Sequence, residues 1–243
     1  MDNDLKSGFL LINKPIGMSS FGCISRIKRI VRQKIRIGHA GTLDPFASGL
    51  LIIAIGREAT KLLSRCMVMK KTYKATGKCG ELTDTLDCTG TIIATMETIP
   101  TQAELQKAFD ELGSSYEQIP PIYSALKHQG DSLYTLARKK IVSEQELYAI
   151  AESKKRTIQL YDKQFLSYDL PFFTIQVRVS HGTYIRTLIN DIATRAGSCA
   201  TTYELIRSAI GPFSLDNACD LSSIQTIDEL NRYIIPSDQL FAL

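Results

Sequence analysis

The stretch GHAGTLDPFASGLLIIAIG, residues 38–56, combines a glycine-containing loop with a wholly apolar segment. The unbroken apolar run Leu50–Ile55 is typical of a central strand that is buried on both faces. Gly38, Gly41 and Gly49 lie before or at the start of this run, and glycine allows tight turns and the close approach of another chain segment. We therefore expect a buried strand that follows a tightly turning loop.

This loop carries one acidic residue, Asp44, directly before Pro45. Proline is favoured at the first position of a helix, and aspartate is favoured at the position that caps the helix. One interpretation is therefore structural, with Asp44 capping a short helix before the strand. The other is chemical, because a carboxylate held at a loop–helix junction beside a core strand is placed to act as a nucleophile.

A second informative stretch is SHGTYIRTLINDIA, residues 180–193. Just before it, Phe173–Ser180 alternates apolar and polar residues, which is the pattern of a half-buried strand. A turn follows, and the apolar spacing then predicts a helix from about Thr183 to Arg195. Arg186 would lie in the first turn, where the helix dipole favours anions, so we expect a carboxylate or phosphate partner. The alternative is a surface arginine that pairs with Asp191 or with solvent.

Further elements follow from the same rules. The apolar run Phe9–Ile12 predicts a strand, and residues 102–112 and 143–153 predict helices. The last stretch, Leu221–Leu243, is expected to pack back as a helix and a short strand. Because strands and helices are interspersed without regular strand–helix–strand spacing, we predict an α+β protein with a mixed sheet and not a doubly wound fold.

Positive charge is concentrated in two clusters. The first contains no acidic residue and consists of Arg26, Lys28, Arg29, Arg32, Lys34 and Arg36. The second consists of Lys61, Arg65, Lys70, Lys71, Lys74 and Lys78. The first cluster overlaps an amphipathic helix with Cys23, Ile27 and Val31 on its apolar face and Ser19 or Ser20 as its cap. One cluster alone is compatible with a solvated face, but two clusters beside a glycine-rich apolar segment favour a polyanionic partner.

Composition excludes several classes of protein. The chain has 243 residues, of which 44% are hydrophobic and 22% charged, and its net charge is +4. This composition is ordinary for a globular protein and excludes a disordered chain, a collagen-like fibre and a coiled coil. The longest apolar run is far shorter than the roughly 20 residues that span a bilayer, and the start does not resemble a secretory signal. The 6 cysteines form no C-x-x-C pair and the 3 histidines form no ligand pair, so we expect free thiols, a cytoplasmic protein, and neither metal nor cofactor.

Six segments of the sequence match the motifs of a known family and follow one another in the same order. They are NKPIGMSS (13–20), GHAGTLDP (38–45), KTYKATGKCGELTDTLDCTG (71–90), QIPPIYSALKHQGDSLYTLAR (118–138), SHGTYIRTL (180–188) and LIRSAIGPF (205–213). Together they resemble the bacterial tRNA pseudouridine synthases of the TruB type, from about residue 9 to residue 213. Six collinear matches are much more specific than any one of them.

The resemblance implies roles for particular residues. Asp44 matches the catalytic aspartate that attacks the target nucleotide, and Arg186 matches the arginine that pairs with it. Tyr73 matches the tyrosine that stacks on the flipped uracil and is placed to help move a proton. Implied substrate-binding residues are His39, Gly41, Thr42, Tyr184 and Leu205, the last two as walls of the uracil pocket. The implied fold is a mixed, mostly antiparallel central sheet with flanking helices and RNA-binding loops, and with the active cleft across its middle.

The implied reaction isomerises a uridine in the T-loop of tRNA to pseudouridine: it breaks the C1′–N1 bond, rotates the base and makes a C1′–C5 bond. An ionised carboxylate is required, and an arginine fork beside Asp44 would oppose the neutralising effect of burial. The base must leave its stack, which costs a few kcal/mol, and stacking on Tyr73 would recover roughly 1–3 kcal/mol. The basic clusters would hold phosphates and make binding dependent on salt.

The resemblance also has departures. The family usually continues into a small RNA-binding domain of the PUA type, so we expect a catalytic domain over residues 1–215 and a short segment over 216–243 without a complete PUA domain. Ser132 and Ile206 stand where the family commonly has arginine, and His181 where it commonly has lysine, which predicts altered phosphate contacts with the chemistry retained. The expected partner is the T-arm of tRNA, and we expect a monomer with no obligate protein partner and no membrane contact.

Other functions remain compatible with the sequence. One is an RNA-binding folding factor for tRNA whose catalysis is dispensable, and another is a guide-RNA-dependent pseudouridine synthase of rRNA. A third is a hydrolase of glycosidic bonds, for which Asp84 or Asp87 would supply the second carboxylate. The T-D-T-x-D segment that contains these two residues is explained better by the TruB-type family.

Overall fold

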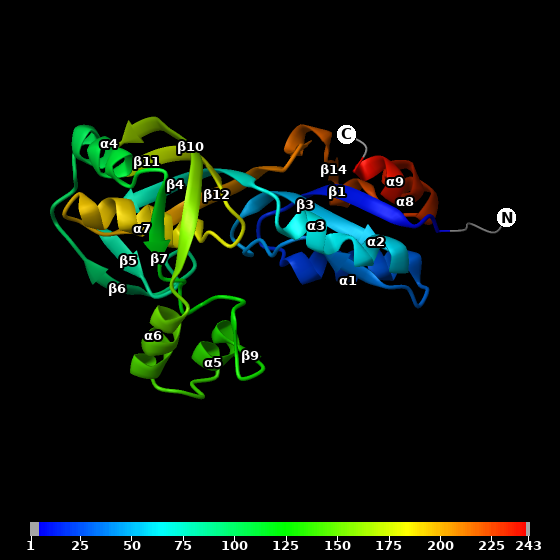
Figure 1. The fold of residues 1–243 in the computed structure, drawn as a ribbon, viewed down its shortest axis with the longest axis horizontal. Helices are drawn as coiled ribbons and strands as arrows, with labels where there is room; N and C mark the ends of the chain where they lie inside the picture. Colours follow the sequence, from blue (N-terminus) through cyan, green and yellow to red (C-terminus); the bar gives the residue numbers. More distant parts are fainter. Residues whose placement is uncertain (1–4, 242–243) are drawn as a thin grey trace. The chain divides into compact units, whose positions relative to one another are not determined.

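A computed structural model describes residues 5–241 of the chain, which form two compact units (Figure 1). The first unit contains the residues up to Tyr73 and those from Ile206 onward, and the second contains Lys74–Leu205. Two long strands, β4 (Lys71–Cys79) and β12 (Ala200–Ile210), contribute residues to both units. The fold is α+β with a mixed, mostly antiparallel sheet, as predicted.

The sheet of the first unit has the strand order β14-β1-β3-β12. The strands β1 (Gly8–Lys14) and β3 (Ser48–Ile55) pair antiparallel, with Leu11 opposite Ile52. β3 pairs parallel with β12, and β1 pairs parallel with β14 (Cys219–Asp220). The predicted strands at 9–12 and 50–55 are therefore confirmed. The short strands β2 (Ile37–His39) and β13 (Phe213–Ser214) pair with β3 and β12.

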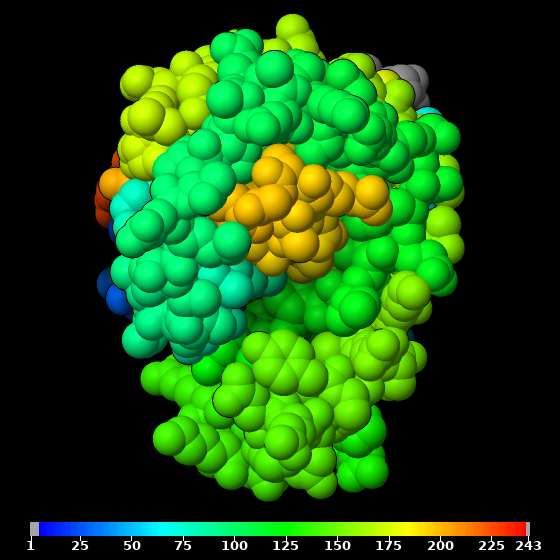
Figure 2. All heavy atoms as spheres, turned by 90° about the vertical axis from the view of Figure 1, so that its left-hand side faces the viewer, coloured from blue at the N-terminus to red at the C-terminus, as the bar shows by residue number. Residues whose placement is uncertain are grey.

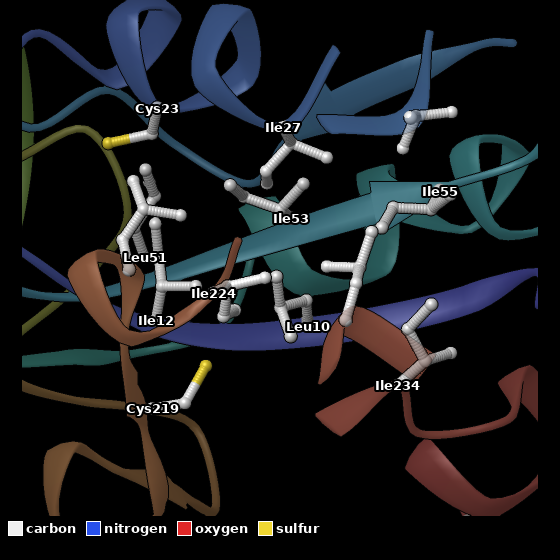
Figure 3. Close-up of a cluster of buried hydrophobic side chains, with 13 residues drawn as sticks. Leu10, Ile12, Cys23, Ile27, Leu51, Ile53, Ile55, Cys219, Ile224 and Ile234 are labelled. Atoms are coloured by element: carbon white, nitrogen blue, oxygen red, sulfur yellow. The ribbon is translucent and has the colours of Figure 1, made fainter. Parts of the chain in front are cut away.

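Helix α1 (Ser20–Val31) covers one face of this sheet (Figure 3). The side chain of Ser19 accepts a hydrogen bond from the amide of Gly22, which caps the helix as predicted. Cys23, Ile27 and Val31 are buried against a cluster that includes Leu10, Ile12, Leu51 and Ile53. The basic residues stay on the opposite face, so the apolar spacing of this segment determined its orientation.

The C-terminal residues complete the same core. Leu221, Ile224, Leu230 and Ile234 belong to the cluster below α1 (Figure 3). The tail forms the short helices α8 (Ile227–Tyr233) and α9 (Ser237–Leu240), preceded by the 3-10 turns η1 (Leu215–Asn217) and η2 (Leu221–Ser223). The helical part of the prediction is confirmed, but the expected strand is reduced to an isolated bridge between Ile235 and Phe9. Residues 242 and 243 lie outside the described part.

The sheet of the second unit has the order β12-β4-β11-β10-β7. The long strand β10 (Arg156–Asp169) pairs antiparallel with both β11 (Phe172–Val179) and β7 (Ser115–Gln118). Alternate residues of β11 are buried, which confirms the predicted strand. α7 (Ile185–Arg195) packs with α4 (Gln102–Glu111) and begins slightly later than predicted.

Smaller elements surround this sheet. The hairpin of β5 (Glu81–Thr83) and β6 (Ile92–Thr95) and helix α4 frame α7 on the face shown in Figure 2, where α7 lies at the centre. Helices α5 (Leu133–Arg138) and α6 (Glu144–Ser153) follow the short hairpin of β8 (Lys127–His128) and β9 (Asp131–Ser132) and bury a small apolar cluster of their own. The first unit adds α2 (Arg57–Lys61) and α3 (Leu63–Met67). No helix among residues 5–241 is long and apolar enough to cross a membrane.

Candidate active site

The loop that carries Asp44 connects β2 to β3 and is a turn, not the start of a helix. The amide of Ala47 donates to the carbonyl of Asp44 at 3.1 Å, so Pro45 occupies the second position of a β-turn. The predicted helix cap is therefore wrong. β3 begins at Ser48, and the three intervening residues leave no room for a helical turn. His39, Gly41 and Thr42 lie on the same loop or at the end of β2.

Arg207 of β12 holds this loop from within the core. Its side chain is buried, and its Nε donates to the carbonyl of Leu50 at 2.8 Å. Its two terminal nitrogens donate to the carbonyls of Gly41 at 3.2 Å and Thr42 at 3.4 Å. A side chain at Gly49 would collide with the main chain of Arg207, so this glycine permits the close approach that the sequence suggested. The guanidinium thus ties the loop to the strand that follows it.

Lys14, the last residue of β1, provides a second buried cation. Its Nζ donates to the carbonyls of Met18 at 2.7 Å, Pro15 at 2.9 Å and Pro45 at 3.5 Å. Burial lowers the pKa of Lys14 to about 8, an effect that the negative charge of Asp44 opposes. Asp44 is therefore within the electrostatic field of a fixed lysine.

Ser20, at the start of α1, fixes the backbone between Thr42 and Asp44. Its hydroxyl accepts from the amide of Leu43 at 2.9 Å and donates to the carbonyl of Leu43 at 3.1 Å. Burial and the nearby charge of Arg207 lower the pKa of His39 on the same loop, which favours the neutral form of its imidazole. Together these contacts make the loop a rigid support for one carboxylate.

Tyr73 and Leu205 lie on the two strands that enter both units. Tyr73 is a buried residue of β4 and belongs to the first unit, and Leu205 is a buried residue of β12 and belongs to the second. The structure therefore gathers His39, Gly41, Thr42 and Asp44 on one loop of the first unit. It places Tyr184 and Arg186 together at the start of α7 in the second unit.

Arg186 is buried within the second unit and has a carboxylate partner there. One terminal nitrogen lies 3.4 Å from Oδ2 of Asp87 and also donates to the carbonyl of Thr85, and the other donates to the carbonyl of Tyr123 at 2.8 Å. The alternative partner considered from the sequence, Asp191, instead accepts a hydrogen bond from Tyr116 at 2.9 Å. Because Arg186 is buried, the hypothesis that it is a surface arginine is excluded.

Asp87 is itself held by the loop that contains it. Its Oδ1 accepts from Thr89 Oγ1 at 2.6 Å, from the Thr89 amide at 3.0 Å and from Thr85 Oγ1 at 3.0 Å. The neighbouring Asp84 accepts from the amide of Thr91 at 2.8 Å. Both carboxylates are engaged in structural hydrogen bonds, so neither is arranged as the free acid that a glycosidic hydrolase needs.

The two basic clusters have different environments. In the first cluster, three arginines line a surface cavity of about 440 Å³, namely Arg26, Arg29 and Arg32. Ile30 and Gln225 complete the lining. The second cluster is less exposed and less positive than expected. Lys61 pairs with Glu58 at 2.9 Å and Lys78 pairs with Glu81 at 2.6 Å, while Lys71 is buried. The first cluster is therefore the better candidate for a phosphate-binding surface.

Sequence reasoning missed several residues that support the site. Lys14 and Arg207 lie within the quoted motifs but received no role, and Asp87 was considered only as the second carboxylate of a hydrolase. The signal that could have identified Lys14 and Arg207 is charge in a segment whose pattern otherwise predicts a buried strand, because a buried charge needs a partner. Lys14 follows an apolar run, and Arg207 lies two residues after the buried Leu205 of the same strand.

Comparisons with known proteins define the class. Residues 28–185 match the family model described as TruB family pseudouridylate synthase (N terminal domain). The fold is similar to that of a chain in the crystal structure of a Cbf5-Nop10-Gar1 complex, with a TM-score of 0.67 and 25% identity, over 91% of this chain and 54% of that one. A chain in the structure of an H/ACA RNP bound to a substrate RNA containing 2'-deoxyuridine gives a TM-score of 0.67 at 22% identity, over 95% of this chain and 59% of that one. This chain thus spans between about half and three fifths of those solved chains.

The fold and the matched segment define a pseudouridylate synthase, which is an enzyme. The chain belongs to the TruB family. It is 41% identical to tRNA pseudouridine synthase B of Bordetella avium over 96% of this chain and 93% of that protein. It is 36% identical to tRNA pseudouridine synthase B of Protochlamydia amoebophila, over 95% of this chain and 84% of that protein, and 40% identical to that of Clostridium novyi, over 96% and 77%.

Proposed function

We propose that this chain converts a uridine in the T-loop of tRNA to pseudouridine. The observation that carries the proposal is the Asp44 loop, held by the buried cations Lys14 and Arg207 in a chain of the TruB family. Relatives that are named tRNA pseudouridine synthase B match nearly the whole chain, which supports tRNA as the substrate. A loop fixed at both ends suits a nucleophile, because the geometry of attack is set before substrate arrives.

In the proposed mechanism Asp44 is the nucleophile. The C1′–N1 bond of the uridine breaks, the uracil rotates, and a C1′–C5 bond forms. The proton from C5 is then lost and N1 gains one, so the product is an isomer of the substrate and no co-reactant is consumed. Arg186 is proposed to pair with the Asp44 carboxylate and hold both oxygens, and Tyr73 to stack on the base and help move the proton.

Arg186 is suited to that task by its contacts within the second unit. Asp87 and the carbonyls of Thr85 and Tyr123 fix the plane of its guanidinium. An arginine fixed in this way loses little conformational freedom when it binds a carboxylate. Tyr184 and Leu205 are proposed to line the uracil pocket, and His39, Gly41 and Thr42 to contact the T-loop.

The remaining contacts are proposed to involve phosphates. The cavity lined by Arg26, Arg29 and Arg32 would bind the RNA backbone in addition to the T-arm contacts. We propose a cytoplasmic monomer that uses neither cofactor nor metal and acts without an obligate protein partner. In this proposal residues 1–215 form the catalytic domain, and the short segment 216–243 follows it.

The test is catalysis by the purified chain on an unmodified T-arm hairpin and on a full tRNA transcript, with pseudouridine detected by mass spectrometry. Asp44→Asn should bind both RNAs with unchanged affinity and give no product, whereas Asp162→Asn, an exposed residue of β10, should match the parent chain. Product formed only after addition of a guide RNA or partner proteins would refute the proposal in favour of the guide-dependent branch. Turnover by Asp44→Asn would refute the nucleophile assignment.

A further inference from the structure

Gln118, the last residue of β7, makes an unusual two-way contact with the main chain of Tyr184. Its side chain is 1% exposed. Its Nε2 donates to the carbonyl of Tyr184 at 3.0 Å, while its Oε1 accepts from the amide of Tyr184 at 2.8 Å. A primary amide carries a donor and an acceptor side by side, as this contact requires. The side chain therefore holds both polar groups of one residue.

This contact lies at the point where β11 turns into α7. Tyr184 occupies the capping position of α7, and no side chain caps the helix there. Its carbonyl also accepts the first helical hydrogen bond, from the amide of Leu188 at 3.1 Å. Gln118 thus fixes the start of the helix from outside, in place of the usual capping side chain.

A second shared network fixes the orientation of the Gln118 amide. The hydroxyl of Tyr116 donates to Asp191 of α7 at 2.9 Å, so its oxygen is free to accept from Gln118 Nε2, which lies 3.0 Å away. This arrangement directs the nitrogen of the amide toward the Tyr184 carbonyl and the oxygen toward the Tyr184 amide. The chain of bonds joins β7 to two separate positions of α7.

The ring of Tyr184 is held by a different residue. The guanidinium of Arg156 lies over the ring, 5.2 Å from its centroid, a distance at which a cation attracts an aromatic face. A side chain at Gly182 would approach Arg156 Nη1 to 2.8 Å, so glycine at this position leaves room for the guanidinium. Arg156 of β10 lies directly opposite Gln118 of β7 in the sheet register. One pair of neighbouring residues therefore holds both the backbone and the ring of Tyr184.

We propose that Gln118 and Arg156 are positioning residues that set the place of the Tyr184 ring, and through it the width of the uracil pocket. The inference rests on the proposed function, in which Tyr184 lines that pocket. Neither residue touches the reacting atoms in this proposal. Both act by removing alternative positions of Tyr184 before the base enters, which is the form of preorganisation that raises the rate of the chemical step.

The variants are Gln118→Glu, which keeps the volume and the acceptor but lacks the donor, Gln118→Leu, which lacks both, and Arg156→Lys. Gln159→Leu is the matched control, because Gln159 lies on the same β7–β10 ladder with an exposed side chain. Single-turnover rates on the T-arm hairpin should fall roughly 10–100-fold for Gln118→Leu, with less than about threefold change in RNA affinity. Gln118→Glu and Arg156→Lys should show smaller losses, and the control none.

A double-mutant cycle separates positioning from general damage. In a Tyr184→Ala background, Gln118→Glu and Gln118→Leu should lower the rate by less than about threefold, because their effect passes through the missing ring. Additive losses, or equal rates for the Gln118 variants and the Gln159 control, would overturn the inference. The Glu variant keeps the test available if the Leu variant does not fold.

A second readout is independent of catalysis. The chain contains no tryptophan, so Tyr184→Trp provides a single tryptophan whose fluorescence can be excited selectively. Its anisotropy should fall when Gln118→Glu or Arg156→Lys is added and should not change with Gln159→Leu. A parent chain without synthase activity would refute the proposed function, whereas an anisotropy unaffected by these substitutions would refute the positioning role.

Discussion

Replacement of Arg207 by methionine tests the idea that a buried cation holds the Asp44 loop. The change removes the donor to the Leu50 and Gly41 carbonyls, and a weaker donor to the Thr42 carbonyl at 3.4 Å. Each hydrogen bond from a charged donor contributes about 1.5–3 kcal/mol, while relief from burying the guanidinium offsets part of the loss. We therefore expect the free energy of unfolding to fall by about 2–4 kcal/mol, as measured by urea denaturation. Arg207→Lys, which keeps one charged donor, should lose about half as much.

The same substitution should change the electrostatics of the loop. The charge of Arg207 lowers the pKa values of His39, Lys14 and Lys71, so its removal should raise all three. An NMR titration of the His39 imidazole measures this shift directly. The rate of pseudouridine formation should fall about 10–100-fold with little change in RNA affinity, because the loop loses its fixed position.

The exposed Arg178 of β11 provides the control, since Arg178→Met removes the same charge from a solvent-facing site. It should leave stability, the His39 titration and the rate unchanged. A loss of stability below about 1 kcal/mol in Arg207→Met, together with an unchanged His39 titration, would show that the guanidinium does not hold this loop.

Three further predictions concern other parts of the molecule. Burial raises the pKa of Asp191 from 3.8 to about 6, so ionisation of this carboxyl disfavours the folded state as pH rises through that interval. Asp191→Asn should therefore raise the free energy of unfolding by about 1–3 kcal/mol at pH 8 and should leave it unchanged below pH 4, as measured by urea denaturation. Equal effects at both pH values would contradict this. Arg29→Ala and Arg32→Ala should each make the negative slope of log affinity against log salt concentration shallower by about 1 in tRNA filter binding. An unchanged slope would exclude phosphate contacts at these arginines. Asp87→Asn removes the carboxylate that lies 3.4 Å from the buried Arg186 guanidinium and should destabilise the protein by about 3 kcal/mol while slowing catalysis, whereas wild-type stability would show that the pair contributes little.

The spacing of apolar residues in the sequence correctly predicted the helices and strands that bury one or both of their faces. β3 and β11 were identified from an apolar run and from strict alternation, and α1 from its apolar spacing and Ser19. These patterns are reliable because the burial of a side chain depends mainly on which face of the element carries it. The end of an element is less certain, and α7 begins at Ile185 since the residues before it belong to the turn that Gln118 holds.

The errors at the candidate site came from local signals with two meanings. An Asp-Pro pair is compatible with the start of a helix and with the start of a β-turn. At Asp44 the turn forms because β3 already begins at Ser48, which leaves too few residues for a helical turn. The partner of Arg186 could not be read from spacing either, because its loop lies far away in the sequence; the contact with Thr85 spans 101 positions. Hydropathy also misleads at Arg207, since a charged residue normally indicates exposure.

The order of the elements along the chain has a consequence for biosynthesis. The second unit is one continuous segment, whereas the core of the first unit joins β1 to residues near the other end, such as Leu230 and Ile234. On the ribosome, the second unit can fold while translation continues. β1 must wait for residues such as Leu230 and Ile234 to emerge, so the nascent first unit leaves its apolar surface uncovered throughout the synthesis of the second unit and depends most on chaperones at that stage.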